Sequence, residues 1–189
     1  MSCPSVLAKV STEGPLCLNL GGAGEGFLDG RISGFVTVDL RDVDGTDIVG
    51  DCADLSQFGD GTVDVIYASN ILEHWSLQKT VDVLKEWCRV LKKGGKLYVS
   101  VPDFDSAVKL YQKTGLTPWL NYHLMGDQKH ALNYHYSLFT AGKLFADLLA
   151  AGFSDMKRVS KFDLGVKDAS QLVDNWTGVP ISLNVVAVK

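Results

Sequence analysis

The most informative stretch for predicting the fold is Leu18-Asn19-Leu20-Gly21-Gly22-Ala23-Gly24-Glu25-Gly26. The run Leu16 to Leu20 is typical of a buried strand, and it leads directly into a cluster of glycines. Gly22, Gly24 and Gly26 permit a tight turn and let backbone N–H groups approach a ligand, because glycine has no Cβ. On this pattern alone, a structural turn and a ligand-binding loop are equally good interpretations, since lone glycine patterns often arise by chance.

Short β-branched runs recur between helix-like stretches along the chain. They lie at Leu16 to Leu20, Phe35 to Leu40, Asp47 to Val49, Val63 to Ala68, Lys96 to Val101, Met156 to Val159 and Leu183 to Val188. This alternation predicts βαβ units. The runs are apolar nearly throughout, as expected of parallel strands that are covered on both faces by helices. The sequence therefore predicts an α/β fold with a doubly wound, mostly parallel sheet.

Two segments have the apolar spacing of amphipathic helices. Residues Thr80 to Leu91 form the first, and the cations and glycines of Lys92-Lys93-Gly94-Gly95 are typical of a helix C-terminus. Residues Ala141 to Ala151 form the second, which ends at Gly152.

Composition limits the classes of function. A chain of 189 residues with 46% hydrophobic residues is long enough for one domain with a continuous core. The net charge of −4 gives no general attraction to nucleic acid or anionic lipid. No apolar run is long enough for a membrane span and the first residues lack a signal-like run, so we expect a cytoplasmic protein. The four cysteines are widely spaced, which favours reduced thiols.

Acidic residues follow the second and third predicted strands. Asp39 is expected beside the glycine loop, where its carboxylate would accept hydrogen bonds from both hydroxyls of a ribose. The alternative is that Asp39 only caps a turn with Arg41 and Asp42. Asp51 is placed to accept from an exocyclic adenine amine, while the Cys52 N–H donates to the ring.

Taken in order, these blocks resemble those of class I S-adenosylmethionine-dependent methyltransferases. The blocks are Leu18 to Gly24, Asp39, Asp51, Asp64-Val65-Ile66-Tyr67-Ala68-Ser69-Asn70-Ile71-Leu72-Glu73-His74 and Arg89-Val90-Leu91-Lys92-Lys93-Gly94-Gly95. The resemblance covers residues 16 to 103, and Val101-Pro102-Asp103 and Ala151-Gly152-Phe153 also look like the family. It implies a Rossmann-like sheet of about seven strands in which antiparallel Leu183 to Val188 inserts beside Met156 to Val159.

The resemblance also implies S-adenosylmethionine as the cofactor and a set of residues that bind it. These are Asn19, Gly21, Gly22, Gly24, Asp39, Asp51, Cys52 and Asn70. Gly22 and Gly24 would line the methionine end, and Asn70 would face the methionine and the sulfonium. Asn19 stands where many members carry an acid, Lys93 replaces a common proline, and the first helix must be short.

Two other functions remain open. A nicotinamide-dependent oxidoreductase is a minority interpretation, because the glycines do not fit Gly-x-Gly-x-x-Gly from either Gly21 or Gly22. A protein that binds S-adenosylmethionine without turnover, or serves as a partner subunit, is favoured by Asn19 and the short first helix.

The segment of residues 104–140 breaks the strand–helix rhythm and is interpreted as an insertion, or lid, over an acceptor pocket. It divides the predicted single domain, 1–189, into a cofactor-binding part, 16–103, and a C-terminal part, 141–189. Its aromatic residues are predicted to pack onto the body more than to stack on a substrate. The crowded insertion favours an enzyme acting on a small-molecule acceptor.

Candidate catalytic residues are His74, His135 and Asp103. A general base is needed only for a hydroxyl or protonated amine acceptor, and histidine suits neutral pH. For His74, a capping or packing role is an equally good interpretation, and for His135 the alternative is a surface loop residue. No metal site is predicted, because His123, His130 and His135 lack a tight ligand pattern.

Overall fold

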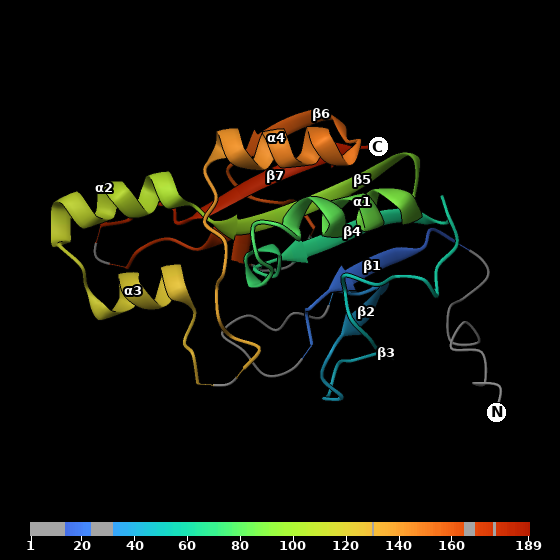
Figure 1. Cartoon of the computed structure of the whole chain (residues 1–189), viewed down its shortest axis with the longest axis horizontal. Helices are drawn as coiled ribbons and strands as arrows, with labels where there is room; N and C mark the ends of the chain where they lie inside the picture. Colours follow the sequence, from blue (N-terminus) through green and yellow to red (C-terminus); the bar gives the residue numbers. More distant parts are fainter. Residues whose placement is uncertain (1–13, 24–31, 130, 165–168, 176) are drawn as a thin grey trace.

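The computed structural model describes residues 14–23, 32–129, 131–164, 169–175 and 177–189 (Figure 1). The predicted short first helix, Gly24 and His130 lie outside these ranges.

A seven-stranded sheet forms the centre of the molecule. Its strands are β1 (Cys17–Leu20), β2 (Phe35–Asp39), β3 (Ile48–Val49), β4 (Val63–Ser69), β5 (Leu91–Pro102), β6 (Ser154–Val159) and β7 (Ser182–Val188). Their order is β3-β2-β1-β4-β5-β7-β6, and β7 runs antiparallel to both β5 and β6 while the other pairs are parallel. The predicted doubly wound, mostly parallel Rossmann-like sheet is confirmed, as is the insertion of the last strand.

One face of the sheet is covered by helices α1 (Thr80–Val90) and α4 (Ala141–Ala151), which lie side by side (Figure 1). Each helix turns an apolar stripe toward the strands. Leu84 and Trp87 of α1 and Leu148 of α4 are fully buried in the main core. Burial of these large side chains fixes both helices to the sheet.

The opposite face is covered by the chain that follows β6, which includes the 3-10 helix η3 (Ala169–Gln171). Phe162 packs edge-on against Tyr67 and Tyr98, with ring centroids 6.0 and 5.5 Å apart. The buried Asn184 amide of β7 donates to the carbonyl of Ser170 in η3 at 2.8 Å. Apolar and polar contacts therefore both attach this segment to the sheet.

Helices α2 (Phe104–Thr114) and α3 (Pro118–Met125) follow β5 directly, so they extend beyond the carboxyl ends of the parallel strands (Figure 1). Asp103 caps α2, and Thr117 caps α3 by accepting from the Leu120 N–H at 3.1 Å. Buried Leu110 and Leu120 join the two helices in a small core of their own. The insertion is thus built as a helical pair at the edge where ligands bind in α/β folds.

The predicted element bounds agree closely with the structure, except at the start of β5. The sequence predicts a strand from Lys96, but α1 ends at Val90 and the strand begins at Leu91. Leu91 is fully buried and pairs with Val63 of β4, and after a register shift regular pairing continues from Lys96. Among the helices within the described ranges, none has the length and hydropathy needed to cross a bilayer.

Candidate functional site

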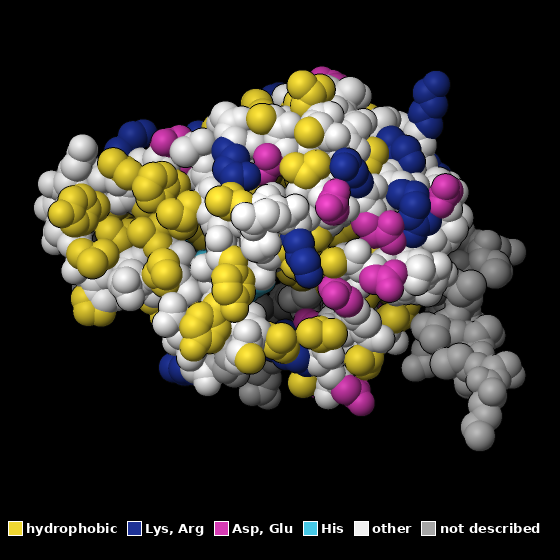
Figure 2. All heavy atoms as spheres, viewed as in Figure 1, with side chains coloured by type: hydrophobic (Ala, Val, Ile, Leu, Met, Phe, Trp, Pro, Cys, Tyr) yellow, Lys and Arg dark blue, Asp and Glu magenta, His cyan; other side chains and the backbone are white. Residues whose placement is uncertain are grey.

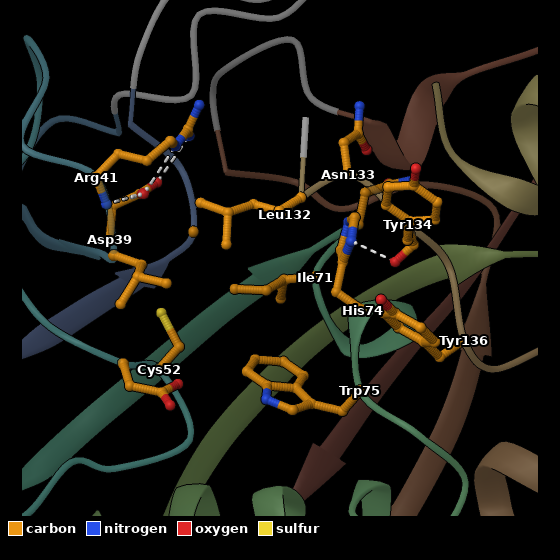
Figure 3. Close-up of a pocket in the computed structure, with 15 residues that line it drawn as sticks. Asp39, Arg41, Cys52, Ile71, His74, Trp75, Leu132, Asn133, Tyr134 and Tyr136 are labelled. Atoms are coloured by element: carbon orange, nitrogen blue, oxygen red, sulfur yellow. Dashed lines mark hydrogen bonds and ion pairs between the residues drawn. The ribbon is translucent and has the colours of Figure 1, made fainter. Parts of the chain in front are cut away.

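The turns that follow β1 to β4 meet at one edge of the sheet and line a cavity of about 370 Å³ (Figure 3). The strand order reverses between β1 and β4, and a crevice forms at such a switch point in open α/β sheets. Gly21, Asp39, Asp51, Cys52 and Asn70 all line this first cavity. The structure therefore brings together five of the eight residues predicted to bind the cofactor.

The glycine stretch bends sharply where β1 ends. Gly21 has φ of +70°, and a Cβ there would overlap the Ile71 side chain, so the turn requires glycine. Gly22 lies so close over Asn19 that a Cβ would overlap its amide. Asn19 is fully buried and donates to Thr37 Oγ1 at 3.3 Å. Asn19 and Gly22 therefore shape the turn from beneath and do not line the cavity.

Asp39 ends β2 with its carboxylate at the cavity and is almost fully buried. Its Oδ1 accepts from the Arg41 N–H at 2.9 Å and from Arg41 Nε at 3.0 Å. Its Oδ2 accepts from Arg41 Nη2 at 2.9 Å and from the Ala23 N–H at 3.2 Å. Burial acts to raise the pKa of Asp39, but these hydrogen bonds together outweigh it and hold that pKa below its usual value. Asp39 is thus a fixed carboxylate (Figure 3).

The turn after β3 supplies Asp51 and Cys52. Asp51 is exposed and accepts from the Ala53 N–H at 2.8 Å, while the buried Cys52 thiol donates to the Val38 carbonyl at 3.3 Å. Burial raises the pKa of Cys52 to about 12, so it is a neutral thiol and not a nucleophile. Trp87 Nε1 donates to the Cys52 carbonyl at 2.8 Å. Helix α1 therefore holds this turn in place.

Asn70 stands where the first cavity joins a second one of about 560 Å³. It follows β4 in the left-handed conformation, with φ of +52°, and its N–H donates to the Ser100 carbonyl at 2.8 Å. Asn70, His74 and Asn133 line both cavities. The second cavity is otherwise formed by α3, the loop after it, and the segment between η3 and β7.

His74 and Glu73 lie in the 3-10 helix η2 (Leu72–His74), just beyond Asn70. His74 Nδ1 lies 3.1 Å from the Tyr134 carbonyl, which orients the ring at the cavity wall (Figure 3). Glu73 is fully buried, and its carbonyl accepts from the Tyr136 N–H at 2.8 Å. Burial raises the pKa of its carboxyl group to about 8, against smaller lowering effects of its own backbone N–H and then of the Asn70 side chain.

His135 lies beside His74, with ring centroids 4.8 Å apart and planes nearly perpendicular. Its N–H donates to the Met125 carbonyl at 3.1 Å, which returns the loop to the end of α3. Burial, followed by the charges of His74 and His123, lowers the pKa of His135 to about 4. The imidazole is therefore neutral at pH 7. Both predicted histidines thus reach the second cavity.

Asp103 lies elsewhere. It is buried, its carboxylate accepts from Ser106 Oγ at 2.9 Å at the start of α2, and it pairs with Arg158 Nη2 at 2.7 Å. Asp103 does not line either cavity. The structure gives it a capping role, and its predicted catalytic role finds no support in this geometry.

The aromatic residues of the insertion differ in their roles. Phe139 is fully buried in the main core, as predicted, but Tyr111 and Tyr122 are 56% and 50% exposed. Apolar side chains gather on the outside over α2 and α3 (Figure 2). Tyr122 and Trp119 line the second cavity, and Tyr134 lines the first. The prediction that Tyr111, Trp119, Tyr122, Tyr134 and Phe139 mainly pack is therefore wrong for Tyr111, Tyr122 and Tyr134, which are exposed.

Sequence reasoning did not assign Arg41, Trp75 or Asn133 to the site, although all three line the first cavity. Trp75 packs edge-on against Trp87, with centroids 6.2 Å apart, and forms one wall (Figure 3). The sequence signal for Arg41 was its place two residues after Asp39. No comparable signal marks Asn133, which reaches the site from a loop 63 residues beyond Asn70.

Comparison with known proteins shows what part of the chain is similar to. Residues 35–99 match the family model described as methyltransferase domain. None of the curated proteins compared with the chain matches it.

Several solved structures share the fold across nearly the whole chain. A S-adenosylmethionine-dependent methyltransferase from Thermotoga maritima is 21% identical with a TM-score of 0.59, covering 98% of this chain and 88% of that one. One from Methanosarcina mazei is 18% identical with a TM-score of 0.58, and the match covers 100% of this chain and 99% of that one. The Burkholderia thailandensis 1,6-didemethyltoxoflavin-N1-methyltransferase is 18% identical with a TM-score of 0.54, and the match covers 97% of this chain and 76% of that one. Residues 35–99 are thus similar to a methyltransferase domain, and the fold of the whole chain is the one that these S-adenosylmethionine-dependent methyltransferases share.

Proposed function

We propose that this protein transfers a methyl group from S-adenosylmethionine to a small-molecule acceptor that binds in the second cavity. The observation that carries this proposal is the junction formed by Asn70, His74 and Asn133, which line both cavities. Two ligands, one in each cavity, would meet there. Holding two reactants in contact is the main contribution that a protein makes to such a transfer.

The residues of the first cavity fit the cofactor. Asp39 is a buried carboxylate at the end of β2, the position from which an acid accepts from ribose hydroxyls. Asp51 and Cys52 lie next to it, where they would hold the adenine. The turn at Gly21 brings the backbone to the cavity wall, and Asn70 lies at the end where we expect the methionine.

One rearrangement is needed for this fit. Asp39 accepts four hydrogen bonds, three of them from Arg41. A carboxylate has about four lone-pair sites, so the ribose must displace part of this set. The Arg41 side chain is 41% exposed and can swing toward solvent, whereas the Ala23 N–H belongs to the turn.

When bound, the cofactor supplies a methyl group on a sulfonium, and an acceptor lone pair takes that methyl while the carbon–sulfur electron pair stays on sulfur. The residues of the protein would position the acceptor and provide polar groups beside it. His74 and His135 place imidazole nitrogens beside the acceptor cavity, and the neutral His135 ring is able to accept a hydrogen bond. Apolar Trp119 and Ile181 exclude water from the same space.

A small acceptor suits a cavity of this size, because pockets for small molecules have volumes of about 300–1,000 Å³. The Burkholderia protein of the same fold is solved with 1,6-didemethyltoxoflavin and S-adenosylhomocysteine bound. We therefore place acceptor selection on α3 and the segment before β7.

The test is a turnover assay that detects S-adenosylhomocysteine and methylated product across a metabolite library. We expect product from the wild type and much less from Asp39→Ala when S-adenosylmethionine is limiting. Tyr122→Ala changes only the second cavity, so it should raise the acceptor KM and leave S-adenosylhomocysteine affinity unchanged. Tight cofactor binding with no product from any metabolite would contradict catalysis and favour the non-catalytic binder. Binding of a nicotinamide dinucleotide in place of S-adenosylmethionine would favour the oxidoreductase.

A further inference from the structure

The side chains of Glu73, His74 and His135 form a cluster that cofactor binding does not explain. One candidate ligand atom from each residue lies within 4.8 Å of the other two. Glu73 is fully buried, and no described residue makes a well-formed hydrogen bond to either of its carboxylate oxygens, although the Asn70 side chain lies near enough to lower its pKa. Nδ1 of His135 is also buried without a partner in the described part of the chain.

An unpartnered buried carboxyl group is costly, so its position calls for an explanation. Removing a polar group from water without a hydrogen bond costs roughly 1–3 kcal/mol by protein mutational data, and an ionised one costs more. The backbone around Glu73 is nevertheless firmly held, because its carbonyl accepts from the N–H groups of Tyr136 and Ser137 at 2.8 and 3.2 Å. The same two bonds anchor the chain that carries His135. The fold therefore holds the three side chains together.

We propose that Glu73, His74 and His135 bind one divalent transition-metal cation of the zinc class. Two imidazoles and one carboxylate are the donor set of an open zinc site that keeps a position for a further ligand. His74 has the expected second contact, since donation from Nδ1 to the Tyr134 carbonyl leaves Nε2 as the ring nitrogen with a lone pair.

The distances suit such a site after a small adjustment. Zinc–ligand bonds of about 2.0–2.1 Å in a tetrahedron put the ligand atoms about 3.4 Å apart. The present separation of up to 4.8 Å would therefore need to shorten by roughly 1.4 Å when a cation binds.

The location gives the cation access to the acceptor cavity. His74 and His135 line the second cavity, whereas Glu73 lies behind them in the core. A cation held there would present its remaining coordination position to an acceptor oxygen or nitrogen. Cation binding itself does not depend on the proposed methyl transfer, so the two are tested separately.

The experiment is a titration of chelator-treated full-length protein with Co²⁺, followed by its visible d–d absorption. Equilibrium dialysis against Zn²⁺ with elemental analysis then gives the stoichiometry. We expect about one cation per chain, with Zn²⁺ displacing Co²⁺. Glu73→Gln and His135→Gln should each weaken Co²⁺ binding more than 100-fold, beyond the roughly 10–100-fold that loss of a second-shell partner costs.

His123→Gln is the matched control. His123 lines the same cavity but is outside the cluster, and its Nε2 lies 3.1 Å from the Ile181 carbonyl. This variant should bind Co²⁺ as the wild type does. Circular dichroism checks folding, and His135→Gln, on a loop, decides the matter if Glu73→Gln does not fold. Absence of a Co²⁺ spectrum, or Co²⁺ binding that survives His135→Gln, would overturn the proposal. S-adenosylhomocysteine titration of the same samples reports on the cofactor site independently.

Discussion

Arg41 donates three hydrogen bonds to the Asp39 carboxylate. Its backbone N–H and Nε donate to Oδ1, and its Nη2 donates to Oδ2, at 2.9 to 3.0 Å. Arg41 Nη2 also donates to the Ala23 carbonyl at 2.6 Å, so the guanidinium joins β2 to the glycine turn. These are the carboxylate oxygens that the ribose of the cofactor would need. The side chain of Arg41 therefore competes with the cofactor for Asp39.

Removal of this guanidinium should strengthen cofactor binding. In Arg41→Ala we expect the Kd for S-adenosylhomocysteine, measured by calorimetry, to fall about fivefold, because displacing a half-exposed ion pair costs about 1 kcal/mol. The Tm of the free protein should fall, since Asp39 loses its partner. Arg158→Ala is the control, because Arg158 pairs with buried Asp103 in the same way but outside both cavities. An unchanged or higher Kd in Arg41→Ala would refute competition.

The turn after β1 should not tolerate a Cβ. In Gly21→Ala the positive φ and the overlap with Ile71 would displace the turn, so we expect a loss of about 1–3 kcal/mol in the free energy of unfolding and weaker S-adenosylhomocysteine binding. Gly142→Ala in α4 is the matched control, because a Cβ there meets nothing within 4 Å and should stabilise by about 0.5–1 kcal/mol. Urea unfolding of both variants measures this difference. Equal stability of the two variants would show that the turn is not constrained.

A substitution at Trp87 should affect both the stability of the protein and its affinity for S-adenosylhomocysteine. Trp87→Phe removes the donor to the Cys52 carbonyl and leaves a small void, so we expect the free energy of unfolding to drop by about 2–4 kcal/mol. The Kd for S-adenosylhomocysteine should rise as the turn at Cys52 loosens. Chemical unfolding together with calorimetry checks both effects. Unchanged binding in a destabilised variant would mean that this turn does not need α1.

Stability should depend on the ionisation of Glu86. The Arg89 guanidinium lowers the pKa of Glu86, against a smaller effect of burial, and a Glu86 oxygen accepts from the Leu55 N–H at 2.8 Å. A lowered folded pKa means that this contribution is present above the unfolded value of about 4.5 and is lost as pH falls through the folded pKa. We therefore expect the free energy of unfolding to fall between pH 6 and pH 3. This fall should be about 1 kcal/mol smaller in Glu86→Gln than in the wild type.

Asp82→Asn serves as the control for this pH series. Asp82 lies on the same helix and pairs with Lys85 in an exposed position. An exposed pair contributes little, so this variant should keep the slope of the wild type. A wild-type slope in Glu86→Gln as well would rule out Glu86 as a source of the pH dependence.

The sheet and one half of the site could be predicted from sequence, because both depend on local pattern. Apolar runs specify buried strands, and residues directly after parallel strands must meet at one edge. Asp39 and Asp51 were located in this way, Asn70 was implied by the family resemblance, and all three line the first cavity. Asp103 follows its strand in the same manner, but Ser106 three residues later marks it as the cap of α2.

The other half of the site depends on the path of a long insertion, which no periodicity specifies. His135 is 61 residues beyond His74, and the two rings meet because the loop after α3 returns to η2 through backbone hydrogen bonds. The complete burial of Glu73 has the same origin, since Glu73 is covered by that returning chain. The histidine spacing within the insertion therefore could not reveal a cluster with a residue of η2.

Calorimetric titration of the wild type and of Asp39→Ala with S-adenosylhomocysteine tests the central claim most directly. We predict one site per chain in the wild type and binding weakened by about 10- to 100-fold in Asp39→Ala, because hydrogen bonds to a charged group contribute about 1.5–3 kcal/mol. No binding by the folded wild type, or equal affinity in the two proteins, would contradict an S-adenosylmethionine site at the ends of β1, β2 and β4.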